Sequence, residues 1–141
     1  HVLIENCLAN GTFLKIETHH LTLKEFHEIG ERINDDHEQL KLAGGMIIFM
    51  VKDEDDQLVL YDKETGRKMT MTTTLPCIQV YTGNFLSGDV RKGGKPYENR
   101  DGVALEAQFL PNSIHIEKEP KVILRKGEEY EAVTTYRFEV E

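Results

Sequence analysis

Cysteine is scarce in this 141-residue sequence, which contains only Cys7 and Cys77. No spacing of cysteine and histidine resembles a zinc ligand set, so we expect no metal centre. A disulfide between the two distant cysteines is compatible with the sequence, but no pattern requires it. We favour two reduced thiols and a cytoplasmic location, because disulfides persist mainly in oxidising compartments.

Long apolar runs and an excess of basic residues are also missing. The longest apolar run, residues 46–51, is far shorter than the roughly 20 residues that a membrane-spanning helix needs. No secretory signal is visible, and His1 cannot be an initiating residue, so we expect a processed product or a piece of a longer protein. The net charge of −8 argues against nucleic acid or an anionic membrane as a partner, since both require a basic patch.

The sequence does contain enough apolar residues for a folded core. Hydrophobic residues make up 39% and charged residues 30%, as is typical of a soluble globular protein. No internal repeat, low-complexity segment or composition shift divides the chain. We therefore predict a single domain over residues 1–141.

Most segments have patterns typical of β-strands, bounded by turn signals such as Asn10-Gly11 and Thr65-Gly66. Helical spacing occurs only over residues 21–34, where Gly30 interrupts it, so a short helix or an irregular loop is expected there. A long loop is expected over residues 86–101. The predicted strands are residues 2–5, 12–17, 46–52, 57–62, 68–74, 77–83, 103–109, 121–125 and 130–140.

This order of elements, without βαβ units, predicts an all-β fold, an antiparallel β-sandwich. The clearest alternation lies in residues 130–140, where Tyr130, Tyr136 and Phe138 fall on one face that we expect to be buried.

The strand predicted over residues 103–109 carries a pair of polar residues suited to chemistry. Strict alternation places Glu106 and Gln108 together on one side, opposite Leu105 and Ala107. A carboxylate and an amide side by side on a rigid strand can hold a hydroxylated ligand and move a proton. The alternative interpretation is the ordinary solvated face of an alternating strand.

Several motifs give the chain a family resemblance. The stretches that carry it are Ile29–Ile33, Gly44-Gly45, Thr73–Pro76, Gln79–Asn84, Arg100, Leu105–Gln108, Pro111-Asn112 and Leu124–Tyr130. In this order they resemble the C-terminal part of the aldose 1-epimerase (galactose mutarotase) family, from about residue 29 to the C-terminus. Residues 1–28 match poorly. The pair Tyr-Thr-Gly-Asn and Leu-Glu-Ala-Gln, properly spaced, is a fairly specific signature.

The resemblance implies part of an antiparallel β-supersandwich with a sugar site on its concave face. It implies an isomerase that interconverts the α and β anomers of aldohexoses without a cofactor. Glu106 inherits the role of general base, while a histidine acts as general acid in the family. An acid and a base are both needed, because one oxygen loses a proton while the other gains one.

The resemblance also bears on three further side chains. Gln79 and Tyr81 share one face of their strand and either line a sugar pocket or pack across strands. Arg100 contacts a sugar hydroxyl or is a solvated turn residue. With Gln108, these three complete the predicted substrate-binding set.

The sequence departs from the family pattern at two places. None of the six histidines lies in the family's histidine motif, and isolated surface histidines are the favoured interpretation. After Gly44-Gly45 the family has Tyr-Asp-His, whereas this chain has Met46-Ile47-Ile48. The sequence therefore predicts a truncated or repacked derivative with little or no activity, whether natural or engineered. The alternatives are a non-catalytic carbohydrate-binding module, or a self-associating module whose apolar face around Ile47 and Ile48 forms a homodimer.

Overall fold

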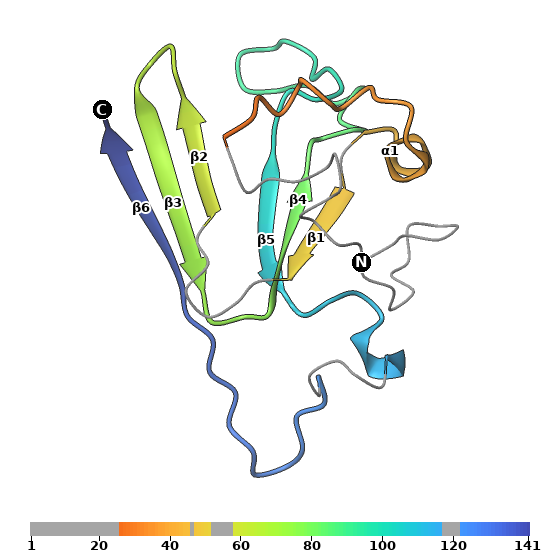
Figure 1. Cartoon of the computed structure of the whole chain (residues 1–141), viewed down its shortest axis with the longest axis vertical. Coiled ribbons are helices and arrows are strands. Elements are labelled where there is room, and N and C mark those ends of the chain that lie inside the picture. Colours follow the sequence, from red (N-terminus) through yellow and green to blue (C-terminus); the bar gives the residue numbers. More distant parts are fainter. Residues whose placement is uncertain (1–25, 46, 52–57, 117–121) are drawn as a thin grey trace. The chain divides into compact units, whose positions relative to one another are not determined.

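The computed structural model describes residues 26–45, 47–51, 58–116 and 122–141 (Figure 1). They group into two compact units, one formed by the described parts of residues 1–50 and 79–106 and the other by those of residues 51–78 and 107–141. The prediction of a single domain stays a prediction. The strands expected over residues 2–5 and 12–17, and the Asn10-Gly11 turn, lie outside the described residues.

The described part of the chain is nearly all β, which confirms the predicted fold class. Its strands form two three-stranded sheets, one ordered β1-β4-β5 and the other β2-β3-β6 (Figure 1). The elements, in chain order, are α1 (Glu38–Ala43), β1 (Ile47–Val51), β2 (Leu58–Asp62), β3 (Arg67–Thr73), β4 (Cys77–Tyr81), β5 (Ala104–Gln108), a 3-10 helix (Ser113–His115) and β6 (Thr134–Val140).

The β2-β3-β6 sheet is antiparallel throughout, and β3 is its central strand. Met71 lies opposite Leu58 on one side and Tyr136 on the other, so these three side chains share one face of the sheet. Met71 is fully buried. At the hairpin between β2 and β3, Gly66 has a φ of 69° and its carbonyl oxygen accepts a hydrogen bond from the Glu141 N–H, 2.9 Å away.

The expected burial along the C-terminal strand is wrong. Residues 130–133 are not part of β6, and Tyr136, Phe138 and Val140 are 46%, 74% and 76% exposed. Tyr130 is also exposed. Alternation identifies which side chains share a face, but it does not say whether anything covers that face. Because β6 is an edge strand of the sheet formed by the described residues, its apolar side chains have a neighbouring strand on one side only, whereas β3 has one on each side.

The sheet β1-β4-β5 is supported by apolar residues on one face of β4. Ile78 and Val80 are buried, whereas Gln79 and Tyr81 alternate with them and are partly exposed. Cys77 is also buried. The structure describes β1 by its main chain and pairing, so the predicted apolar face around Ile47 and Ile48 stays a prediction.

The described part of the segment with helical spacing is an irregular loop, one of the two structures that the sequence left open, and a helix follows it. Residues 29–36 form turns and bends, and the helix begins only at Glu38. The Nδ1 atom of His37 accepts a hydrogen bond from the Gln39 N–H and caps the helix, while Gly44 ends it in the left-handed region at φ 63°. Within the described part of this loop Ile33 is buried whereas Phe26 is exposed, so the apolar spacing does not mark one buried helical face.

One of the two remaining expected segments agrees with the structure and the other does not. The loop predicted over residues 86–101 is present, with an isolated bridge between Val90 and Pro96. The strand predicted over residues 121–125 is absent from its described part, residues 122–125, which form no strand. Within the described residues, no helix has both the length and the apolar character needed to cross a membrane.

Candidate sugar site

Two neighbouring strands bring a carboxylate and an amide together. The side-chain amide nitrogen of Gln79 on β4 donates a hydrogen bond to the Oε1 atom of Glu106 on β5, 3.2 Å away. Both side chains therefore lie on the same face of the β1-β4-β5 sheet. The buried side chains of Ile78 and Val80 lie on the opposite face of β4.

Glu106 is the exposed residue of β5, while its four strand neighbours are partly covered. Gln108 follows it by two positions and so projects to the same side of the strand. Among the described residues, the side-chain carboxylate of Glu106 has Gln79 as its one hydrogen-bond partner. The Gln79 amide bonds one carboxylate oxygen, Oε1, and the second oxygen can accept a hydrogen bond from a ligand.

Tyr81 lies two residues after Gln79 and shares its face of β4. Its hydroxyl oxygen accepts a hydrogen bond from the Phe85 N–H, 3.1 Å away, so the following turn fixes the position of the phenol. The hydroxyl proton remains able to donate to a ligand. The aromatic ring also offers a face on which a sugar can stack.

The turn after β4 requires glycine at position 83. Gly83 has a φ of 64°, and a Cβ atom there would lie 2.6 Å from Leu86 Cδ1 and 2.8 Å from the Gly102 carbonyl oxygen. Any other residue would both strain the backbone and collide with these atoms. Glycine thus allows the chain to turn closely enough for the Phe85 N–H to reach Tyr81.

The buried polar residues of the Tyr-Thr-Gly-Asn motif, Thr82 and Asn84, form hydrogen bonds within the protein. The Thr82 hydroxyl donates to Asn84 Oδ1, 2.7 Å away, and the Asn84 amide donates to the Ala43 carbonyl oxygen, 2.9 Å away. Asn84 is only 3% exposed. The motif therefore ties the end of α1 to the end of β4. Sequence reasoning did not assign this task, although a threonine and an asparagine flanking a turn glycine are the relevant signal.

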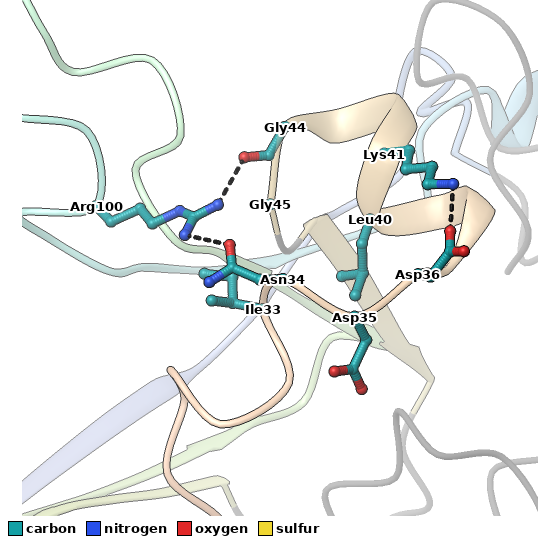
Figure 2. Close-up of a pocket in the computed structure, with 9 residues that line it drawn as sticks. All are labelled: Ile33, Asn34, Asp35, Asp36, Leu40, Lys41, Gly44, Gly45 and Arg100. Carbon is teal, nitrogen blue, oxygen red and sulfur yellow. Dashed lines mark hydrogen bonds and ion pairs between the residues drawn. The ribbon is translucent and has the colours of Figure 1, made fainter.

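Of the five predicted site residues, all of which the structure describes, Arg100 alone lines the pocket formed beside α1. It lines an open pocket of about 510 Å³ together with Ile33, Asn34, Asp35, Asp36, Leu40, Lys41, Gly44 and Gly45. Figure 2 shows its guanidinium between the loop before α1 and the end of the helix. Nη1 donates to Asn34 Oδ1 at 2.8 Å, and Nη2 donates to the Gly44 carbonyl oxygen at 3.3 Å.

The backbone of Arg100 is itself unusual. Its φ is 74°, in the left-handed region that a residue with a side chain seldom occupies. The Arg100 N–H donates to the Gly83 carbonyl oxygen, 2.8 Å away, which holds the residue in this conformation. The structure thus anchors the arginine by both its main chain and its side chain, more firmly than a solvated turn residue.

The described histidines have other environments. His27 Nδ1 lies 3.5 Å from Glu31 Oε2, His37 caps α1, and His115 is exposed on the 3-10 helix. None of these three forms a hydrogen bond with Glu106. Within the described residues, no group of three or more histidine, cysteine, aspartate or glutamate side chains has an arrangement that would hold a metal ion.

The arrangement of strands and the motif residues agree with one known class of proteins. The family model for aldose 1-epimerase matches residues 2–137. The chain therefore belongs to the aldose 1-epimerase family. The match begins at residue 2, so the family pattern also covers most of residues 1–28, where the sequence analysis found only a poor match.

Individual relatives agree with this assignment. The chain is 31% identical over 140 residues to a galactose mutarotase of Homo sapiens and 33% identical over 109 residues to an aldose 1-epimerase of Escherichia coli strain K12. These alignments cover 96% and 74% of this chain, but only 40% and 32% of the relatives. A solved structure of a GalM/aldose epimerase homologue from C. elegans superposes with a TM-score of 0.82 over 99% of this chain and 42% of that one, at 21% identity, and so shares its fold.

Proposed function

We propose that the chain carries the proton-accepting part of a sugar-anomerising site, with Glu106 as the general base. The hydrogen bond between Gln79 and Glu106, on an exposed sheet face of a chain in the aldose 1-epimerase family, is the observation that carries the proposal. The substrate is an aldohexose. Gln79, Tyr81 and Gln108 bind it through hydroxyl groups and by stacking.

The chemistry follows from the acceptor capacity of the carboxylate. Gln79 occupies one oxygen of Glu106 and orients the group, so that the other oxygen can take the proton of the anomeric hydroxyl. As that proton leaves, the bond between the anomeric carbon and the ring oxygen breaks, and an acid protonates the ring oxygen. The open-chain aldehyde then rotates and closes on its other face, which returns both protons.

The acid has to come from outside the described contacts of Glu106. Among the described residues, His27, His37 and His115 have other partners or environments. In keeping with the expectation from the sequence, we propose weak aldohexose binding and little or no catalysis for this chain. The chain spans about 40% of the length of the human relative, so the activity of a whole family member is a proposal for this chain and not a finding.

Arg100 is kept in the proposal as a contact for a sugar hydroxyl in its own pocket. Two of its five N–H donors are taken by Asn34 and Gly44, and no bond from the remaining donors to another described side chain competes with a ligand. The predicted absence of a cofactor, the cytoplasmic location and the absence of a nucleic-acid partner stay predictions.

Optical rotation and NMR test the proposal together. Freshly dissolved α-galactose is followed by polarimetry with the chain and with buffer, while backbone NMR shifts are recorded during a sugar titration. We expect saturable shifts at Tyr81 and Gln108, and any rate above buffer should fall to the buffer rate in Glu106→Gln. Glu98→Gln, in the exposed loop, is the matched control and should change neither result.

Two outcomes would contradict the proposal. One is a rate above buffer that Glu106→Gln leaves unchanged. The other is the absence of shifts at Tyr81 and Gln108 at high sugar concentration. The second candidate function, a non-catalytic sugar-binding module, is favoured by the exposed Glu106 without a described histidine contact. Saturable shifts with a rate equal to buffer, both in the unchanged chain and in Glu106→Gln, would select it.

A further inference from the structure

The strand β6 combines an open edge with an uncovered apolar face. It is the outer strand of the β2-β3-β6 sheet, and within the described residues its far edge has no strand partner. On one face Tyr136, Phe138 and Val140 are exposed, next to β3 residues such as Met69 and the fully buried Met71. Unpaired main-chain donors and acceptors beside apolar side chains make a template for another strand.

The residues of β6 are complementary to themselves when the strand is reversed. Phe138 is the centre, Arg137 and Glu139 flank it, and Tyr136 and Val140 stand outside them. A second β6 running antiparallel about Phe138 places Arg137 opposite Glu139 of the second copy, and Glu139 opposite its Arg137. Both symmetry-related contacts then join opposite charges, while aromatic and β-branched residues meet on the other face.

We propose that two copies of this chain associate through β6, with Phe138 opposite Phe138 on a two-fold axis. The contact joins two three-stranded sheets into one continuous antiparallel sheet. The occupant is a second copy, because the charge pattern of the strand matches its own reversed sequence. This proposal rests on β6 alone and does not depend on the sugar site.

In the proposed dimer, the charges of Arg137 and Glu139 both keep an opposite charge beside them. In the single chain, the Arg137 guanidinium already donates to Glu139 Oε2, with Nη2 at 2.8 Å and Nε at 3.0 Å. Across the two-fold axis, two arginines and two glutamates alternate, so that each charge has an opposite charge on both sides. The apolar face gains burial at the same time, since Phe138 and Val140 are the most exposed apolar residues of β6.

A charge-swap mixing experiment tests this register. Sedimentation equilibrium of the 141-residue chain across concentration should show a monomer–dimer equilibrium. Arg137→Glu alone places glutamates opposite glutamates, and Glu139→Arg alone places arginines opposite arginines, so each should weaken the dimer by about tenfold or more. An equal mixture of the two variants should form a heterodimer with an affinity near that of the unchanged chain.

The mixture separates the proposed contact from effects on folding. Neither variant chain recovers its internal pair between positions 137 and 139, so restored association in the mixture has to come from contacts between chains. Lys95→Glu carries the same change in charge on an exposed loop and should leave the dimer unchanged. Circular dichroism of each variant checks that the fold is retained.

Three results would overturn the proposal. A strict monomer at all concentrations removes the dimer. A dimer that tolerates Arg137→Glu forms through another surface, such as the β1 face expected from the sequence. Weakening by both single variants without recovery in the mixture contradicts the antiparallel register about Phe138.

Discussion

The side-chain amide of Asn84 donates a hydrogen bond to the carbonyl oxygen of Ala43, 2.9 Å away, and joins the turn after β4 to the last residue of α1. Helix ends leave carbonyl oxygens without partners inside the helix, so an external donor stabilises them. Here the donor is almost completely buried, and its own oxygen accepts from the Thr82 hydroxyl.

Replacing Asn84 by alanine should lower the free energy of unfolding by about 1–3 kcal/mol, because the Ala43 carbonyl and the Thr82 hydroxyl lose a buried partner. Urea unfolding followed by circular dichroism measures the change. Asn99→Ala is the matched control, since the Asn99 side chain accepts a hydrogen bond from the Ser87 N–H on the exposed surface. Equal losses in the two variants would contradict the structural importance of Asn84.

Gly45→Ala should destabilise the fold by about 1–3 kcal/mol, since inserting a methyl group into a packed site forces neighbours to move. A Cβ atom at this position would lie 2.2 Å from Asn84 Oδ1, and the φ of 155° is unfavourable for alanine. Thermal unfolding measures the effect. A Cβ atom at Gly30 would have no atom within 4 Å, so the control Gly30→Ala should leave the stability nearly unchanged. A large loss of stability in this control would contradict the attribution of the Gly45→Ala effect to steric collision.

Arg100→Lys should lower the free energy of unfolding by about 0.5–1.5 kcal/mol, because lysine cannot reproduce the two-pronged contact with Asn34 and Gly44. Chemical denaturation gives the value. The exposed Arg91, whose contact with Asp101 is 3.4 Å long, provides the control Arg91→Lys. A smaller loss for Arg100 than for Arg91 would contradict the anchoring role.

The turn between β2 and β3 gives a prediction about pH. The Thr65 hydroxyl and the Glu64 N–H donate hydrogen bonds to Asp62 and hold the pKa of its carboxyl below the ordinary value. Thr65→Val should therefore raise the pKa of Asp62 toward that value, whereas Thr65→Ser should retain the depression. Carboxyl ¹³C shifts recorded through an acid titration measure both.

The sign of the linked stability follows from the lowered pKa. Because the folded state favours the ionised carboxylate, the contribution of Asp62 is present above its unfolded pKa and is lost as the pH falls through its folded pKa. The stability difference between the unchanged chain and Thr65→Val should shrink over that acid range. A difference that grows on acidification would contradict the assignment.

The strands could be predicted from sequence where alternation and turn residues agreed. β2, β3 and β5 begin and end within one residue of their predicted limits, because Thr65-Gly66 marks the turn between β2 and β3 and alternating side chains mark the extended backbone of β5. The bounds of the helix α1 were not predicted. It has only 6 residues, and its end is held by Asn84 and Arg100, which lie far away in the sequence.

The residues of the candidate site also differ in whether the sequence could place them. Gln79, Tyr81, Glu106 and Gln108 could be placed on faces by period-two alternation, and the bond between Gln79 and Glu106 agrees with that placement. Arg100 could not be placed in this way, since its partners Asn34 and Gly44 are 66 and 56 residues away. The exposure of Phe138 was also beyond a sequence pattern, because it depends on what lies beside an edge strand.

The hydrogen bond from Glu141 to Gly66 has a practical consequence for labelling the protein. The main chain of Glu141 is fixed against a hairpin whose glycine has no room for a side chain, since a Cβ atom at Gly66 would lie against the Glu141 carbonyl oxygen. An affinity handle fused directly after this residue has to start from an immobilised peptide and turn away at once. A flexible glycine–serine spacer would release that constraint and leave the hairpin undisturbed.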